Sequence, residues 1–104
     1  MAKLKTITDK RTGKTLYPVG NFLKYQHVFY NASDRAFNGY YDALETGSDD
    51  EIDRAEEWKA RVDDILDKFN SNPQVNGIVY AYYEDYKIMK DIIGGYAERH
   101  GGYV

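Results

Sequence analysis

The sequence predicts a mainly α-helical domain: a three-helix bundle preceded by a short N-terminal β-hairpin. Apolar residues recur every three or four positions over three long stretches, which is typical of helices with one buried face. Helix-capping residues stand at the starts of these stretches. A length of 104 residues fits a single domain over 1–104. We divide it into a basic hairpin or arm over 1–19 and a helical core over 20–104.

The N-terminal residues predict the β-hairpin. Leu4 to Thr8 alternates as a short strand, 9–14 form a turn, and 15–17 form a return strand that Pro18 ends. Two strands alone are marginally stable in water, so the hairpin needs a surface to lie on. The alternative is an extended arm that becomes ordered only on a partner. Its bases are Lys3, Lys5, Lys10, Arg11 and Lys14.

The first long helix is expected to begin after Asn21, whose side chain can cap it, and to end at Gly47. Asn31, Ser33 and the pair Asn38-Gly39 weaken the helical pattern, so we expect a bend or break near 31–33. The predicted buried face holds Phe22, Tyr25, Phe29, Ala36, Tyr40 and Leu44.

The second helix has the clearest start in the chain. Ser48 and Glu51 have the spacing of a capping box, in which each side chain satisfies the other residue's backbone amide. The acids that follow are favoured at the positive end of the helix dipole. The predicted buried face holds Ile52, Ala55, Trp58, Val62, Ile65, Leu66 and Phe69.

The segment from Pro73 to His100 has two interpretations. An apolar stripe runs in phase from Val75 to Tyr96, which favours one continuous helix capped by Asn72. The alternative is an α+β fold, with residues 77–83 as a third strand beside the hairpin, because this run is β-branched and aromatic. Asp85 would then cap a shorter helix. Its position beside the apolar stripe of the continuous helix favours that alternative.

Composition excludes several classes of protein. The chain has 42% hydrophobic and 30% charged residues, which is typical of a globular domain, and it has no cysteine for a disulfide or a thiolate metal site. No apolar run is long enough to span a membrane, and the N-terminus does not read as a signal peptide. We therefore expect a cytoplasmic protein that does not associate with membranes.

No motif for catalysis is present. His27 and His100 have no metal-ligating neighbour at a useful spacing, and the serines lie in no nucleophile motif. Arg54 stands where a calcium-binding loop needs glycine. We expect no enzymatic activity, no cofactor and no metal site.

Charge is distributed unevenly along the chain. Residues 1–23 hold five bases and one acid, whereas 42–67 hold eleven acids and three bases. On an ideal helix, five of these acids lie roughly opposite the buried face of the second helix. We call them the acidic row: Asp49, Asp53, Glu56, Asp63 and Asp67.

The acidic row is predicted to lack compensating bases. Asp50, Glu57 and Asp64, on the flank, each have a base four residues on, whereas the row contains like-charge pairs at that spacing, which destabilise a helix. The row is therefore either an ordinary solvated face or a surface that binds a basic partner.

Tyrosine is abundant, with eleven in the chain. Exposed tyrosines supply rigid contact area with a polar tip and are enriched in interfaces. Helical geometry predicts that Tyr80, Tyr41 and Tyr83 lie away from the buried faces, so we count them as partner-binding candidates.

These features favour a small acidic protein-interaction module that binds a larger basic protein. Small acidic domains of this kind occur among phage and mobile-element proteins, including inhibitors of host nucleic-acid-binding proteins, and this analogy suggests such a role. One alternative is a structural or assembly subunit, a homo-oligomer in which the basic arm of one copy meets the acidic helix of the next. The other is a weak nucleic-acid binder acting through the basic arm, which is disfavoured because the remaining surface would repel nucleic acid.

Overall fold

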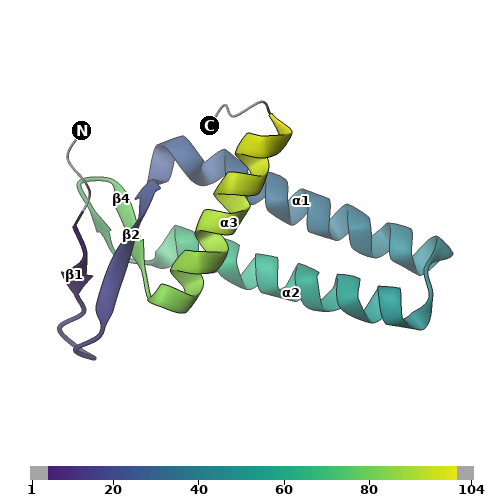
Figure 1. Ribbon diagram of the computed structural model, residues 1–104, viewed down its shortest axis with the longest axis horizontal. Helices are drawn as coiled ribbons and strands as arrows, with labels where there is room; N and C mark the ends of the chain where they lie inside the picture. The colour runs from purple at the N-terminus through teal and green to yellow at the C-terminus, as the bar shows by residue number, and fades with distance from the viewer. Residues whose placement is uncertain (1–4, 101–104) are drawn as a thin grey trace.

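The computed structural model describes residues 5–100, which form three helices and four short strands (Figure 1). In chain order these are β1 (Ile7–Thr8), β2 (Thr15–Asn21), α1 (Phe22–Thr46), α2 (Asp49–Ser71), β3 (Gln74–Val75), β4 (Ile78–Ala81) and α3 (Tyr83–Arg99).

The helices α1 and α2 form a long antiparallel hairpin. The sheet lies at the end of this hairpin where α1 begins, and α3 crosses both helices near the sheet (Figure 1). The molecule measures 46 × 34 × 16 Å. A mainly α chain with a small β element is confirmed. A three-helix bundle is not, because α3 crosses the other two helices instead of running along them.

The predicted continuous helix from Pro73 to His100 is wrong, and the alternative strand is present as β4. The segment turns back at Asn76 and Gly77, which both have positive φ, 53° and 80°. An Asn-Gly pair with these angles is the usual two-residue turn of a β-hairpin, and it joins β3 to β4. The helix α3 then begins at Tyr83. Asp85 lies in its first turn and is not its cap.

The sheet has the order β1-β2-β4-β3 and is antiparallel throughout. The strand β2 is longer than expected, because it continues through Pro18 to Asn21 and pairs with β4. The pairing is irregular between Pro18 and Gly20. A proline has no backbone N–H to donate, and strands tolerate it at such irregularities. Leu4, expected in the first strand, lies outside the described residues.

The helical caps follow the sequence. The side chain of Asn21 accepts a hydrogen bond from Lys24 N at 2.9 Å, and that of Ser48 accepts one from Glu51 N at 3.3 Å. Gly47 is the C-cap of α1. The predicted weakening near 31–33 does not break the helix, since α1 is continuous. Packing against α2 supports the weak segment, where Ser33 Oγ donates to Asp63 Oδ1 at 3.2 Å.

The core lies where the two long helices meet the sheet and α3. Phe29 and Phe69 are fully buried there, and their rings stack with centroids 4.2 Å apart. Beyond Ala36 on α1 and Val62 on α2 the core ends, because α3 does not extend that far along the hairpin (Figure 1). Leu44, predicted to be buried, is consequently 46% exposed. Trp58, also predicted to be buried, is 48% exposed, although it lines a cleft with residues of α3.

An ion-pair junction joins α2 to the start of α3. Lys68 Nζ lies 3.0 Å from Asp64 Oδ2 and 3.2 Å from Asp85 Oδ1. These carboxylates, Asp64 foremost, raise the pKa of Lys68 above its ordinary value, although partial burial opposes the shift. The junction fixes the first turn of α3 against α2.

We expect Lys68→Met to lower the free energy of unfolding by about 0.5–1 kcal/mol at neutral pH, a small value because water screens these groups. A raised pKa means that the stabilisation is present below the ordinary lysine pKa and is lost as pH rises through the folded-state pKa. The free energies of unfolding of the wild type and of Lys68→Met, measured with urea, should therefore become equal at strongly alkaline pH. Lys90→Met, on the exposed side of α3, is the control. An equal difference at neutral and alkaline pH would contradict this role.

Candidate protein-interaction surface

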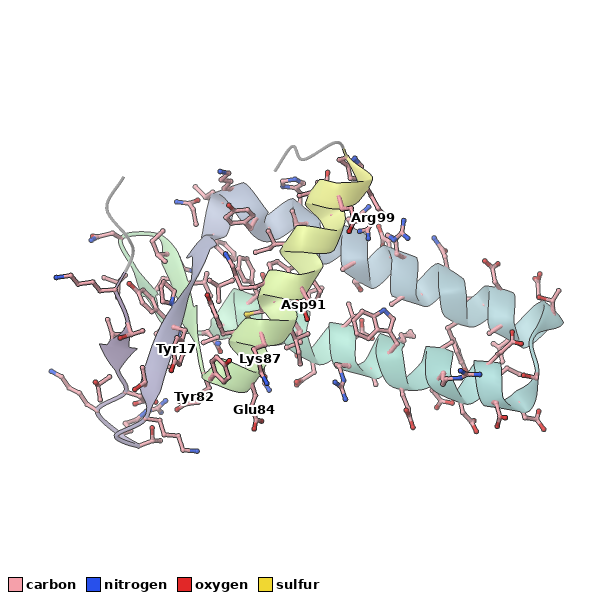
Figure 2. All side chains as sticks on the ribbon, in the orientation of Figure 1. Tyr17, Tyr82, Glu84, Lys87, Asp91 and Arg99 are labelled. Carbon is pink, nitrogen blue, oxygen red and sulfur yellow. The ribbon has the colours of Figure 1, made fainter. Side chains whose placement is uncertain are left out.

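The acidic row lies on the exposed side of α2. Asp49, Asp53, Glu56 and Asp67 are all exposed, and at about 100° per residue the five positions fall within a sector of roughly 80°. Figure 2 shows several oxygen-tipped side chains projecting from α2. The predicted clustering of these carboxylates on one side of the helix therefore agrees with the fold.

Asp63 differs from the other four. Its Oδ2 is 2.9 Å from Lys59 Nζ, and its Oδ1 accepts the Ser33 hydroxyl. The prediction that Asp63 is uncompensated is wrong, because Lys59 stands four residues before it and α1 supplies the hydroxyl. Asp63 is the principal cause of the raised pKa of Lys59. Its role is to join α2 to α1.

The other four carboxylates have no basic nitrogen within 4 Å in the part of the chain from 5 to 100. Of the three predicted flank pairs, only that of Asp64 with Lys68 is formed within this distance. Arg54 instead donates its Nε to the backbone oxygen of Asp50. The row thus presents four negative charges that the described residues do not compensate at short range.

The three candidate tyrosines lie in different places. Tyr80 is only 6% exposed, so the prediction that it lies away from the buried faces is wrong: it lies in β4, not on a helix, and it is part of the core. Tyr41 is 51% exposed and lies on the α1–α2 hairpin. Tyr83 is 53% exposed, but it lies at the sheet, where its ring centroid is 5.2 Å from that of Tyr17.

The basic residues form a turn at the other end of the molecule. Lys10, Arg11 and Lys14 are exposed in the connection between β1 and β2, whereas the α1–α2 loop lies at the opposite end of the long axis (Figure 1). The turn is anchored, because the Tyr82 hydroxyl donates to Asp9 Oδ2 at 2.5 Å. This hydrogen bond is the main cause of the lowered pKa of Asp9. Lys5 is also exposed, and Lys3 lies outside the described residues.

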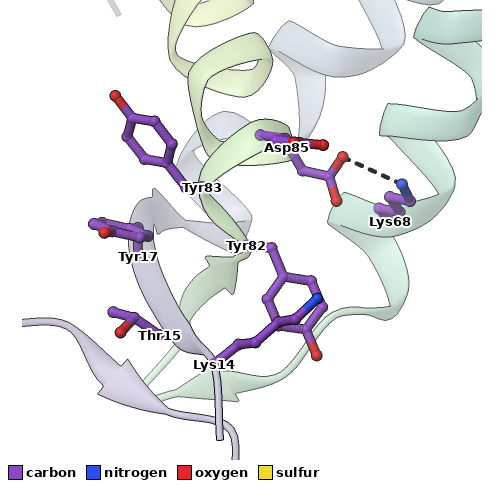
Figure 3. A pocket seen from close by; sticks show the side chains of 8 residues that line it. Lys14, Thr15, Tyr17, Lys68, Tyr82, Tyr83 and Asp85 are labelled. Atoms are coloured by element: carbon purple, nitrogen blue, oxygen red, sulfur yellow. Dashed lines mark hydrogen bonds and ion pairs between the residues drawn. The ribbon is translucent and has the colours of Figure 1, made fainter. Parts of the chain in front are cut away.

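A cleft of about 440 Å³ lies between this turn and the start of α3. Figure 3 shows Tyr17, Tyr82 and Tyr83 around it, with the Lys68–Asp85 ion pair on one side. Lys14 Nζ is 5.7 Å from the centroid of the Tyr82 ring. Lys14 and Lys68 therefore both contact other groups of the protein. The side chains that line the cleft mainly hold the turn against α3.

One feature of α1 was missed by the sequence interpretation. Five large apolar side chains are about half exposed or more on a single face of this helix, and we call them the α1 seam. Four of them are spaced seven residues apart in the sequence, but this pattern overlaps with the apolar stripe that predicts the buried face of the same helix. The seam consists of Leu23, Tyr30, Phe37, Tyr41 and Leu44.

The seam borders the acidic row at Asp63. Lys59 Nζ lies 5.8 Å from the centroid of the Phe37 ring and 2.9 Å from Asp63, so it stands between the two features. The hydrogen bond from Ser33 to Asp63 crosses the same boundary. One side of the hairpin therefore combines an apolar strip on α1 with carboxylates on α2.

None of the three helices in the described residues is long and apolar enough to cross a membrane. Residues 5–100 contain no group of three His, Asp or Glu side chains that could hold a metal ion. Comparison of the chain with protein-family models, curated proteins and solved structures gave no match.

Proposed function

We propose that this protein is a non-enzymatic interaction module that binds a basic protein through the acidic row of the α1–α2 hairpin. The observation that carries the proposal is the set of four exposed carboxylates with no base within 4 Å among residues 5–100. Asp49 and Asp53 are like charges one helical turn apart, an arrangement that slightly destabilises a helix. A basic partner would offset this repulsion. The electrostatic field of the carboxylates would also steer such a partner to the hairpin.

The partner class that matches the row best is a protein with a basic surface that grips phosphate groups. Carboxylates on the continuous helix α2 offer such a surface a fixed line of negative charge. By analogy with small acidic proteins of phages and mobile elements, the module would then inhibit a nucleic-acid-binding protein by occupying that surface.

The experiment compares three forms of the immobilised protein. The row variant carries Asp49→Asn, Asp53→Asn and Glu56→Gln, which remove charge and keep shape. The control variant carries Asp50→Asn, Glu57→Gln and Glu84→Gln, which remove equal charge elsewhere. Proteins retained from a cell extract by the wild type are identified, purified and titrated against all three forms in rising salt.

We expect the row variant to bind the purified partner at least about tenfold more weakly, corresponding to about 1.4 kcal/mol, and the control to lose much less. Affinity of the wild type should fall as salt screens the charges. A partner that binds the wild type and the row variant equally, at all salt concentrations, would remove this proposal.

Self-assembly is the second candidate, and one observation favours it. The basic turn and the tip of the acidic hairpin lie at opposite ends of the long axis (Figure 1). A contact of the turn of one copy with the hairpin of the next would be head-to-tail, which generates rings or filaments. Light scattering over a range of protein and salt concentrations distinguishes this arrangement from a monomer that binds another protein.

A further inference from the structure

The α1 seam is too regular to be a scatter of surface apolar residues. Leu23, Tyr30, Phe37 and Leu44 follow each other at intervals of seven, and Tyr41 lies one turn beyond Phe37. At about 100° per residue all five fall within a sector of roughly 60°. They are five of the eight large hydrophobic side chains exposed among residues 5–100. Single exposed apolar residues are ordinary, but several large ones along one face of a helix favour an interaction site.

The seam is not part of the intramolecular core. The buried residues of α1, Val28, Phe29 and Ala36, centre about 130° away from it around the helix axis. Ala32 and Arg35 line a cleft with residues of α3, and Ser33 contacts α2. The helices α3 and α2 therefore cover the sides of α1 that do not carry the seam. The seam therefore faces away from α3.

The distal half of the hairpin is incompletely packed. No side chain from 37 to 61 is buried, although both helices continue through this region. Helices in proteins gain most of their stability from packing an apolar face. With five large side chains about half exposed or more, the seam offers on the order of 500 Å² of surface, a large share of the roughly 800 Å² that one partner contributes to a standard interface.

A seven-residue repeat indicates the kind of surface that would cover the seam. Apolar residues at this spacing stay in line with a second helix packed at a shallow angle, as in coiled coils. The strip from Leu23 to Leu44 is roughly 30 Å long, which corresponds to about six turns of a partner helix. The carboxylates beside it select a helix with bases along that flank.

We propose that the seam and the acidic row form a groove for an amphipathic α-helix of the partner, apolar on the face that meets α1 and basic on the flank that meets α2. This inference rests on the proposed function and specifies the partner's docking element. A second copy of the chain fits less well. Stacking two such faces would place carboxylates against carboxylates or against the apolar seam, and Lys59 is already paired with Asp63.

The probe is a synthetic helical peptide of about 21 residues, long enough for the seam. It has leucines at a heptad spacing, lysines along one flank and a fluorescent label. One control peptide replaces the lysines with glutamates, and another keeps the lysines but scrambles the leucines. Fluorescence anisotropy measures their binding to the wild type, to a seam variant with Phe37→Ala and Leu44→Ala, and to Tyr83→Ala. Tyr83 is an equally exposed aromatic residue away from the hairpin.

We expect the lysine peptide to bind the wild type at least about tenfold more tightly than either control peptide. The seam variant should bind the lysine peptide more weakly than the wild type by a similar factor. Tyr83→Ala should bind it as tightly as the wild type does. Circular dichroism confirms that each variant is folded. The acidic-row variant should also bind the lysine peptide more weakly, with the difference shrinking in high salt.

The outcomes separate the two proposals. Binding that depends on the row but not on the seam, or that accepts the scrambled peptide equally, would overturn the helix groove and leave the acidic module intact. Binding that depends on the seam but not on the row or on salt would overturn the acidic module. The groove proposal would also be overturned if the lysine peptide does not bind. It would be overturned as well if the wild type forms a dimer that the seam variant does not form.

Discussion

Replacing Phe69 with alanine is expected to lower the free energy of unfolding by about 3–5 kcal/mol. The side chain is fully buried, and its ring lies 4.2 Å from that of Phe29 and 5.6 Å from that of Phe22, measured between centroids. Phe69 thus links the end of α2 to the start of α1, beside the sheet. Truncation would leave a cavity bounded by two other aromatic rings. The loss is large because the whole free energy of unfolding of a small domain is only about 5–15 kcal/mol.

Urea unfolding followed by circular dichroism measures this loss. Phe37→Ala is the matched control, because it removes the same atoms from the half-exposed seam, where the cost should stay below about 1.5 kcal/mol. A cost below about 1 kcal/mol for Phe69→Ala, or equal costs for both variants, would mean that the core does not lie at this end of the hairpin.

Replacing Gly20 with alanine is expected to destabilise the protein by about 1–3 kcal/mol. A methyl group at this position would lie 2.5 Å from Cε2 and 2.6 Å from Cδ2 of the Tyr25 ring, which packs against the core. Gly20 is buried at the irregularity of β2, directly before the cap of α1. The substitution therefore forces the ring or the strand to move where sheet and helix are joined.

The control for this variant is Gly39→Ala. Gly39 lies inside α1, and a Cβ added there meets no atom within 4 Å. Alanine is the better helix former, so this change should stabilise the protein by about 0.5–1 kcal/mol. Thermal unfolding of both variants should show shifts of opposite sign. A neutral Gly20→Ala would show that the Tyr25 ring can move aside without cost.

The architecture places the least packed part of the molecule where the candidate surface lies. Sheet, α3 and aromatic core hold one end of the hairpin. The other end is a two-helix projection that carries the part of the seam from Phe37 to Leu44 and most of the acidic row. In such a projection the turn at Gly47 and Ser48 already holds α1 beside α2, so both sides of the proposed groove would be in place before a partner binds. Little ordering would then be needed on binding, which lowers its entropic cost.

Local chemistry predicted much of the helical hairpin. Asn21 and Ser48 cap the helices as expected, because a side-chain oxygen two or three positions before free amides needs no distant partner. The Asn76-Gly77 pair also predicts a β-turn, and reading it as such would have favoured the strand over the continuous helix. The misplaced Tyr80 follows from that one error.

The sequence by itself determined where α1 begins and ends, where α2 begins, and that carboxylates gather on one side of α2, because caps and helical periodicity act within a few residues. Only the tertiary structure decided the state of residues 78–81, since an apolar run this short suits a helix or a strand until β2 offers backbone partners. It also decided which apolar face of α1 is covered. Both faces carry large side chains, and the docking of α2 and α3 on one of them left the α1 seam exposed to solvent.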